Sequence, residues 1–356
     1  DQWDGFRRTV SLLKSFPISV CLRRRPIAQI PLTLACWDYD RSRPLHDGTV
    51  KVDGVNLNYL SLPVEEIFWR MCQFEEFDAS EMSLSAYLLY RTRPNPPFIA
   101  IPVFPSRMFR HAFVFINVNS GIELPEDLKG KRIGIPEWAM TAIVWLKGIF
   151  QNEYGVKPED VEYRVGGLEN PGRQERIGIT LPANVKLSEI PDDRTLSDEL
   201  EDGEIDALFT SRIPRCFRKG SPNVRRLFEN HKQVEMDYFK RTGIFPIMHT
   251  IVIKEEIVRE HPWITQSLYK AFCEGKAIAD EWLRDTQAIR YTLPWLLTEI
   301  EEEESVMGKD LWPYGVEGSR KTLEALMQFS VEQGLAEQEI PIEDLFAKNT
   351  QSPFRV

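Results

Sequence analysis

Two apolar segments, each preceded by turn residues and a histidine, constrain the fold of this chain most strongly. The segment 104–117 places two arginines and a histidine ahead of an apolar run, and the segment 243–253 places one histidine ahead of another. Short apolar runs bounded by turn residues are typical of buried strands. We interpret the two segments as partner crossings between two lobes, with a ligand site in the cleft between them.

The remaining pattern divides into two α/β lobes. A chain of 356 residues is long enough for two cores. Apolar strands alternate with amphipathic helices, which predicts a mostly parallel sheet flanked by helices in each lobe. We assign 31–117 and 248–356 to lobe I and 118–247 to lobe II. The basic stretch 1–30 is expected to be a disordered or non-native extension.

Composition excludes several classes of function. The formal net charge of -10 argues against a nucleic-acid partner. Five scattered cysteines without CxxC spacing indicate reduced thiols and a cytoplasmic protein. No apolar run reaches the roughly 18 residues of a membrane span. No HxH or HExxH pattern is present, so no metal is expected; convergence of Asp38, Asp40, Glu81 and histidines on a metal in the folded chain is the alternative. Homo-oligomerisation stays open.

Polar residues stand where the expected strands end or helices begin. Ligands of open α/β sheets bind outside the carboxyl ends of strands, so these positions are candidate binding residues. They are Asp38, Tyr39, Glu81, Ser83, Thr141, Ser211 and Arg212. Helix capping is the competing interpretation for the hydroxyl residues and acids.

Seven motifs resemble those of the 4,5-dihydroxyphthalate decarboxylase family. The likeness extends from about Leu32 to Phe346. The motifs are LACWDYDR at 34–41, LPVEEIF at 62–68, SEMS at 80–83, IPVFPSR at 101–107, TLSD at 195–198, RTGIFPIMH at 241–249 and WPYG at 312–315. The resemblance implies a two-lobed fold like that of type II periplasmic binding proteins. It also implies conversion of 4,5-dihydroxyphthalate to 3,4-dihydroxybenzoate and carbon dioxide without an organic cofactor.

This reaction needs a proton donor for the ring carbon that loses its carboxylate, because that carbon must end with a hydrogen. Within the resemblance, His249 is the first candidate for the general acid or base and His111 the second, facing it across the hinge. Glu81 is the third candidate catalytic residue, and Glu81 and Asp38 are both candidates to accept hydrogen bonds from the ring hydroxyls.

A planar guanidinium suits a carboxylate that stays on the ring. The candidate carboxylate holders are Arg107, Arg110 and Arg212, with a salt bridge as the alternative role for each. Tyr39, Ser83, Thr141 and Ser211 are expected to complete the ligand site.

A solute-binding protein that delivers an aromatic or sulfonate anion to an ABC transporter is the alternative, because one fold can serve both uses. Such a protein needs a signal peptide or a lipid anchor. Residues 1–30 contain no Ala-x-Ala cleavage site and only a poor lipobox, which favours the enzyme.

Overall fold

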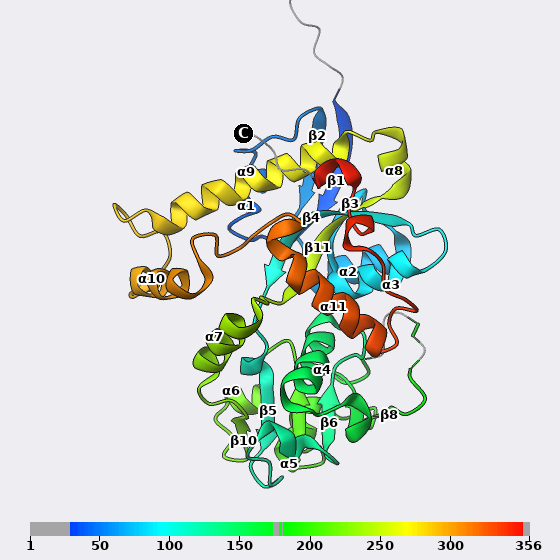
Figure 1. Cartoon of the computed structure of the whole chain (residues 1–356), viewed down its shortest axis with the longest axis vertical. Helices are drawn as coiled ribbons and strands as arrows, with labels where there is room; N and C mark the ends of the chain where they lie inside the picture. The colour runs from blue at the N-terminus through cyan, green and yellow to red at the C-terminus, as the bar shows by residue number, and fades with distance from the viewer. Residues whose placement is uncertain (1–28, 174–177, 180, 352–356) are drawn as a thin grey trace, which may run out of the picture.

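The structure, a computed structural model, describes residues 29–173, 178–179 and 181–351. Residues 1–28, most of the stretch expected to be an extension, lie outside this range. The described chain forms two lobes, each built around one β-sheet (Figure 1). The predicted two-lobed α/β architecture is therefore confirmed.

The sheet of lobe I has five strands. Their order is β2 (Val55–Leu60), β1 (Ile30–Ala35), β3 (Ala79–Ser83), β11 (Ile247–Lys254) and β4 (Phe98–Arg107). The first three run parallel, whereas β11 is antiparallel to both of its neighbours. The long returning strand thus occupies the interior of the sheet, next to the strand that leads out of the lobe.

The sheet of lobe II has six strands. Their order is β10 (Val224–Arg226), β5 (Val114–Asn117), β9 (Ala207–Phe209), β6 (Arg132–Ile135), β7 (Glu162–Val165) and β8 (Lys186–Glu189). Strands β9, β6, β7 and β8 are parallel, and β5 is antiparallel to β9 and β10. In each sheet the strands run in one direction apart from one antiparallel strand that adjoins a crossing, β11 in lobe I and β5 in lobe II, so the mostly parallel sheets that were predicted are confirmed.

The predicted lobe boundary at 117 is wrong by a few residues. Strand β5 pairs with β9, so that Val114 lies opposite Phe209 in the second sheet. The chain therefore changes lobes between Arg107, at the end of β4, and Val114. The sequence hides this point because the apolar run of β5 directly follows the hinge.

Helices cover both sheets. They are α1 (Arg43–His46), α2 (Val64–Phe74), α3 (Leu84–Thr92), α4 (Thr141–Tyr154), α5 (Leu196–Asp202), α6 (Arg215–Arg218), α7 (His231–Thr242), α8 (Glu255–Glu260), α9 (Ile264–Arg284), α10 (Leu296–Met307) and α11 (Arg320–Glu332). Within the described ranges, no helix has the length and apolar character needed to cross a membrane.

Helix α11 fixes how the lobes sit relative to one another, because it packs against α4 of lobe II (Figure 1). The Phe329 ring of α11 lies so close to Gly148 that a Cβ there would meet it at 2.1 Å. The Trp145 indole donates a hydrogen bond to the Ile247 carbonyl oxygen of β11 at 2.9 Å. These contacts hold the first turn of α4 at the edge of the interlobe cleft.

Candidate active site

A cavity of about 340 Å³ lies in this cleft, beyond the carboxyl ends of β1 and β3 and beside the start of β11. We call it the inner cavity. Its volume suits a small organic ligand, and its position is the one expected for an α/β protein. The predicted site residues that line it are Tyr39, Ser83, Arg110, Thr141, Ser211, Arg212 and His249.

Strand pairing places a histidine and a carboxylate side by side at this cavity. His249 of β11 lies opposite Ser83 of β3, and Glu81 lies two residues earlier on the same face. Diagonal neighbours on one face of an antiparallel pair are within contact distance. The His249 Nδ1 lies 2.6 Å from Glu81 Oε1. Irregular register between β11 and β4 around His249 helps to aim the imidazole, as bulges commonly do.

Glu81 is fully buried and has several hydrogen-bond donors around it. Its Oε1 also accepts from the Tyr39 hydroxyl at 2.6 Å, and Oε2 accepts from the Trp37 backbone N–H at 3.0 Å. Burial alone would raise the pKa of Glu81, but the His249 charge and these hydrogen bonds outweigh it and lower that pKa below its ordinary value. Glu81 is therefore an anion near neutral pH, and an ionised carboxylate can only accept hydrogen bonds.

The anionic Glu81 fixes the orientation of His249. Its oxygen takes the Nδ1–H, which leaves Nε2 as the imidazole nitrogen available to a ligand. The ring of Phe68 stands edge-on to the imidazole, with 4.8 Å between centroids, and limits its rotation. The His249 side chain is 17% exposed, whereas Glu81 is 0% exposed. The pair thus presents one proton-carrying nitrogen to the cavity and keeps its counter-charge in the core.

Arg110 supplies a buried positive charge to the same cavity. Its Nε donates to the Met248 sulfur at 3.1 Å, a weak acceptor. Its Nη1 is buried and has no hydrogen-bond partner among the described residues. Burial lowers the pKa of Arg110 to about 9, which still leaves it charged at neutral pH. A buried guanidinium with an unmade hydrogen bond lowers the stability of the fold. An anion in the cavity would supply the missing acceptor and balance the charge.

Hydroxyl groups join the two lobes at the cavity. Thr141 Oγ1, in the first turn of α4, lies 2.7 Å from Ser83 Oγ and 2.9 Å from Ser85 Oγ. The Ser85 backbone N–H also donates to Thr141 Oγ1 at 3.2 Å. Ser83 precedes α3 directly, so the first turns of two helices meet here. Their N–H groups favour negative charge at this end of the cavity.

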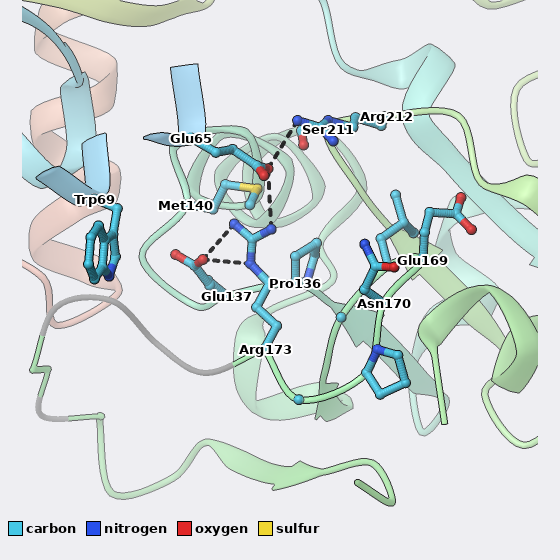
Figure 2. Close-up of a pocket in the computed structure, with 14 residues that line it drawn as sticks. Glu65, Trp69, Pro136, Glu137, Met140, Glu169, Asn170, Arg173, Ser211 and Arg212 are labelled. Carbon is cyan, nitrogen blue, oxygen red and sulfur yellow. Dashed lines mark hydrogen bonds and ion pairs between the residues drawn. The ribbon is translucent and has the colours of Figure 1, made fainter. Parts of the chain in front are cut away.

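A second cavity of about 340 Å³ adjoins the first, and Figure 2 shows the residues that line it. We call it the outer cavity. The two cavities share Glu65, Met140, Ser211 and Arg212. Arg212, whose side chain is 61% exposed, reaches Glu65 at 3.2 Å. The predicted carboxylate holder Arg212 therefore lies at the cavity, but it is paired with an acid of the opposite lobe.

The structure does not bring Arg107 to the cavity. Its buried guanidinium donates to the carbonyl oxygens of Phe245 at 3.1 Å and Pro313 at 2.7 Å, and to Ser319 Oγ at 2.5 Å. Arg107 therefore ties the end of β4 to the C-terminal segment. The prediction that it holds a substrate carboxylate is wrong, because its side chain is engaged elsewhere.

His111 and Asp38 also lie away from the cavity lining. The His111 ring is buried against Phe228, with 5.3 Å between ring centroids, so it does not face His249. Asp38 forms an ion pair with Arg43, and its Oδ1 lies 3.7 Å from His46 Nδ1, so its carboxylate is turned toward α1. Neither residue can take the predicted role in the chemistry.

Glu81 lies beside the predicted catalytic His249, but it is not part of the cavity lining, where the predicted acceptor of a ring hydroxyl would have to lie. It is buried beneath His249 and cannot accept a hydrogen bond from a ring hydroxyl in the cavity. Sequence reasoning missed Glu65 and Phe68 as lining residues, although both lie in the LPVEEIF motif at 62–68. Their spacing of three residues on a helix, which puts both on one face, was the available signal.

Among the described residues, no three histidine, cysteine, aspartate or glutamate side chains are grouped as a metal ion would require. A comparison with models of known protein families finds no match.

Two solved structures share the fold of the chain. The periplasmic aliphatic sulphonate-binding protein SsuA from Escherichia coli is 12% identical, with a TM-score of 0.50, over 92% of this chain and 96% of that one. The periplasmic sulfonate-binding protein SsuA from Methylobacillus flagellatus is 11% identical, with a TM-score of 0.52, over 90% of this chain and 92% of that one. These similarities confirm the expected periplasmic-binding-protein-like fold and, at such identities, show the fold alone.

Two relatives are much more similar in sequence. The 4,5-dihydroxyphthalate decarboxylase of Pseudomonas putida is 41% identical over 221 residues, which cover 62% of this chain and 86% of that protein. The 4,5-dihydroxyphthalate decarboxylase of Comamonas testosteroni is 38% identical over 330 residues, which cover 93% of this chain and all of that protein. This chain therefore belongs to the 4,5-dihydroxyphthalate decarboxylase family of carboxy-lyases.

Proposed function

We propose that this protein converts 4,5-dihydroxyphthalate to 3,4-dihydroxybenzoate and carbon dioxide in the inner cavity. The names of its two relatives support the reaction. The observation that carries the proposal is the buried Glu81 carboxylate 2.6 Å from the Nδ1 of a cavity-lining histidine. A site that only captured an anion would need positive charge and donors, but not a proton-transfer pair.

His249 is the proton donor in this proposal. The imidazolium holds one proton at Nδ1 against Glu81 and one at Nε2 toward the substrate. Glu81 stabilises the imidazolium and keeps the productive tautomer after the Nε2 proton has left. A general acid placed in this way contributes about 10²–10⁴-fold to a rate.

Arg110 holds the carboxylate that stays on the ring. Its buried Nη1 has no hydrogen-bond partner among the described residues, and a carboxylate is the acceptor that best matches a guanidinium. The pair would also remove the cost of the incompletely bonded buried charge. The N–H groups of the first turn of α4 lie at the same cavity, where Ala142 is part of the lining, and would add to the anion-binding field.

The departing carboxylate is expected beside two apolar residues of the cavity lining, Phe68, whose ring contacts the His249 imidazole, and Met140. An apolar surface disfavours the charge of the carboxylate and favours neutral carbon dioxide. The bond between the ring and this carboxylate breaks as the Nε2 proton is delivered to the same ring carbon. The electrons of the broken bond restore the aromatic ring.

The hydroxyl para to the departing carboxylate assists this step, since it donates electron density to the carbon that is protonated. One proton is consumed for each carbon dioxide released, and solvent returns it to Nε2. No oxidant, reductant or organic cofactor enters this balance.

The alternative is a binding protein for an aromatic or sulfonate anion. The fold is compatible with it, as the sulfonate-binding proteins share this fold. A binding protein would give saturable binding of the dicarboxylate without product. The two functions are therefore separated by turnover rather than by affinity.

The test is to incubate the purified protein with 4,5-dihydroxyphthalate and to follow carbon dioxide and 3,4-dihydroxybenzoate. Phthalate is the matched control, because it has both carboxylates but lacks the electron-donating hydroxyls. We expect equimolar products from the first compound and none from the second. Binding of 4,5-dihydroxyphthalate without carbon dioxide release would reject the decarboxylase proposal.

A further inference from the structure

One carboxylate of lobe I stands between the inner and outer cavities. Glu65, in the first turn of α2, lines both of them. Its Oε1 lies 3.2 Å from Arg173 Nη1 and 3.2 Å from Arg212 Nη2 (Figure 2). Both arginines belong to lobe II, so Glu65 closes a bridge across the mouth of the cleft.

The two arginines differ in how firmly they are held. Arg173 also binds the buried Glu137, with Nε 2.7 Å and Nη2 2.6 Å from Glu137 Oε1. Among the described residues, Glu65 is the one acid within ion-pair distance of Arg212. If Glu65 moves away, Arg212 therefore loses its ion-pair partner among the described residues, whereas Arg173 keeps its ion pair with Glu137.

Arg212 can reach the inner cavity as well as the bridge, because it is part of both linings. Arg110 lies deeper in the cleft, and its buried guanidinium is the proposed binding group for the first carboxylate of the ligand. An aromatic 1,2-dicarboxylate carries a second carboxylate next to the first. That second group is chemically equivalent to the Glu65 side chain and competes with it for the same guanidinium.

We propose that Glu65 is an exchangeable gate: it holds Arg212 in the empty protein and releases it to the second carboxylate of an incoming dicarboxylate. This inference deepens the proposed function, because it rests on a dicarboxylate ligand in the inner cavity. A monocarboxylate satisfies Arg110 and leaves the Glu65–Arg212 pair in place. Arg212 therefore favours dicarboxylates over monocarboxylates, and competition from Glu65 sets how large that preference is by opposing dicarboxylate binding alone.

The expected effect is modest and specific. Glu65 and Arg212 have side chains that are 41% and 61% exposed, and ion pairs at such positions are weak. Removal of the competing charge should strengthen dicarboxylate binding by about two- to fivefold. The same change should leave monocarboxylate binding within about twofold, since Arg212 takes no part in it.

The experiment measures the dissociation constants of phthalate and benzoate by titration calorimetry, without turnover. The variants are Glu65→Gln, Arg212→Gln and the double variant. Glu66→Gln is the matched control, because Glu66 neighbours Glu65 on α2 but pairs with Arg70 of the same helix at 2.8 Å. Thermal unfolding of each variant reports whether the fold is retained.

We expect Glu65→Gln to tighten phthalate binding and not benzoate binding, and Glu66→Gln to change neither. Arg212→Gln should weaken phthalate binding, and in that background Glu65→Gln should have no further effect. Equal changes for both ligands, or the same gain without Arg212, would show that Glu65 only ties the lobes together and would overturn the gate.

Failure of the gate and failure of the proposed function have different signatures. Absence of saturable phthalate binding to the unmodified protein would overturn the gate. The decarboxylase proposal would still be decided by carbon dioxide release from 4,5-dihydroxyphthalate. Conversely, ligand-selective tightening without any carbon dioxide release would support the gate on a binding protein.

Discussion

The two crossings between the lobes each carry a histidine, and the two histidines lie in opposite environments. On the returning strand, His249 lines the inner cavity and shares a hydrogen bond with Glu81 at 2.6 Å. On the outgoing crossing, His111 is 1% exposed, and neither of its ring nitrogens has a hydrogen-bond partner among the described residues. The local sequence around both is a histidine next to an apolar strand. What separates them is the neighbouring strand, which offers His249 an acid on the same face.

The two arginines of the outgoing crossing also differ in their surroundings. Arg107 donates to two carbonyl oxygens and a hydroxyl and is not part of the inner-cavity lining, whereas Arg110 lines that cavity and donates to the Met248 sulfur. In the described part of the chain, each keeps one buried nitrogen without a hydrogen-bond partner, Nε of Arg107 and Nη1 of Arg110. Within each pair, position at the inner cavity therefore separates the proposed site residue from the residue buried elsewhere in the fold.

The largest expected effect separates the two histidines. His249→Gln should lower kcat for decarboxylation by about 10²–10⁴-fold, because the proton donor is lost. His111→Gln should keep kcat within a few-fold, since His111 lies outside the cavity lining. Steady-state assays of both variants with 4,5-dihydroxyphthalate test this. Comparable losses in the two variants would remove the distinction between the crossings.

Removal of the carboxylate under His249 should have the next largest effect. Glu81→Gln should lower kcat by roughly 10- to 100-fold, in line with hydrogen bonds to charged groups worth about 1.5–3 kcal/mol. KM should change less, because Glu81 does not touch the ligand. The pH range in which Glu81→Gln is active should also move to lower pH, because a neutral amide stabilises the His249 imidazolium less than the Glu81 carboxylate does. An unchanged pH profile of kcat would contradict a positioning role for Glu81.

The arginine pair should separate binding from stability. Arg110→Gln should raise KM by roughly 10- to 100-fold through loss of a charge-assisted carboxylate contact. Arg107→Gln should instead lower the free energy of unfolding by about 1–3 kcal/mol, as it leaves buried carbonyl oxygens without donors. KM measurements and urea unfolding of both variants provide the check. A KM effect in Arg107→Gln larger than in Arg110→Gln would reverse the assignment.

The last expected effect concerns the fold rather than the reaction, and it is a pH dependence of stability due to His111. Burial lowers the pKa of His111 to about 4 from its ordinary 6.5. The folded state therefore binds fewer protons than the unfolded state between these values, and stability falls as pH falls through this window. The loss amounts to at most about 3 kcal/mol.

His111→Gln should not show this part of the acid loss. Urea unfolding of the variant and the unmodified protein at pH 7 and pH 5 measures the difference. Glu235, 4.0 Å from His111 Nδ1, titrates in the opposite sense, because burial raises its pKa to about 7. Glu235 is present in both proteins, so its contribution cancels when the change in unfolding free energy between pH 7 and pH 5 is compared between the variant and the unmodified protein. An identical pH dependence in both would show that His111 is not held neutral by burial.

Much of the fold could be predicted from apolar periodicity, as the strands β1, β2, β3, β4 and β11 show. Strand β8 could not, because its residues Lys186–Glu189 are mostly exposed and carry no buried pattern. Helix α7 could not either, since it buries only Tyr238 among its residues. Local patterns report burial, and elements held by few buried residues carry little of that signal.

The site was harder to predict than the fold. The family motifs contain His249 and Arg107 but neither Arg110 nor His111, so motif membership alone does not select the residues that line the cavity. Pairing of β3 with β11 decides which histidine meets Glu81, and this is a contact between residues 168 positions apart. Glu65 was not predicted as a site residue, because the helix dipole favours acids in the first turn of any helix and such a position is not distinctive.

The most direct test of the central claim is turnover of 4,5-dihydroxyphthalate in D₂O, with the product analysed by mass spectrometry and NMR. We predict one carbon dioxide for each 3,4-dihydroxybenzoate formed and one deuterium at the ring position that lost its carboxylate. His249→Gln should bind phthalate like the unmodified protein and form almost no product. Deuterated product from His249→Gln at the unmodified rate, or no product from either protein, would contradict proton delivery by the Glu81–His249 pair.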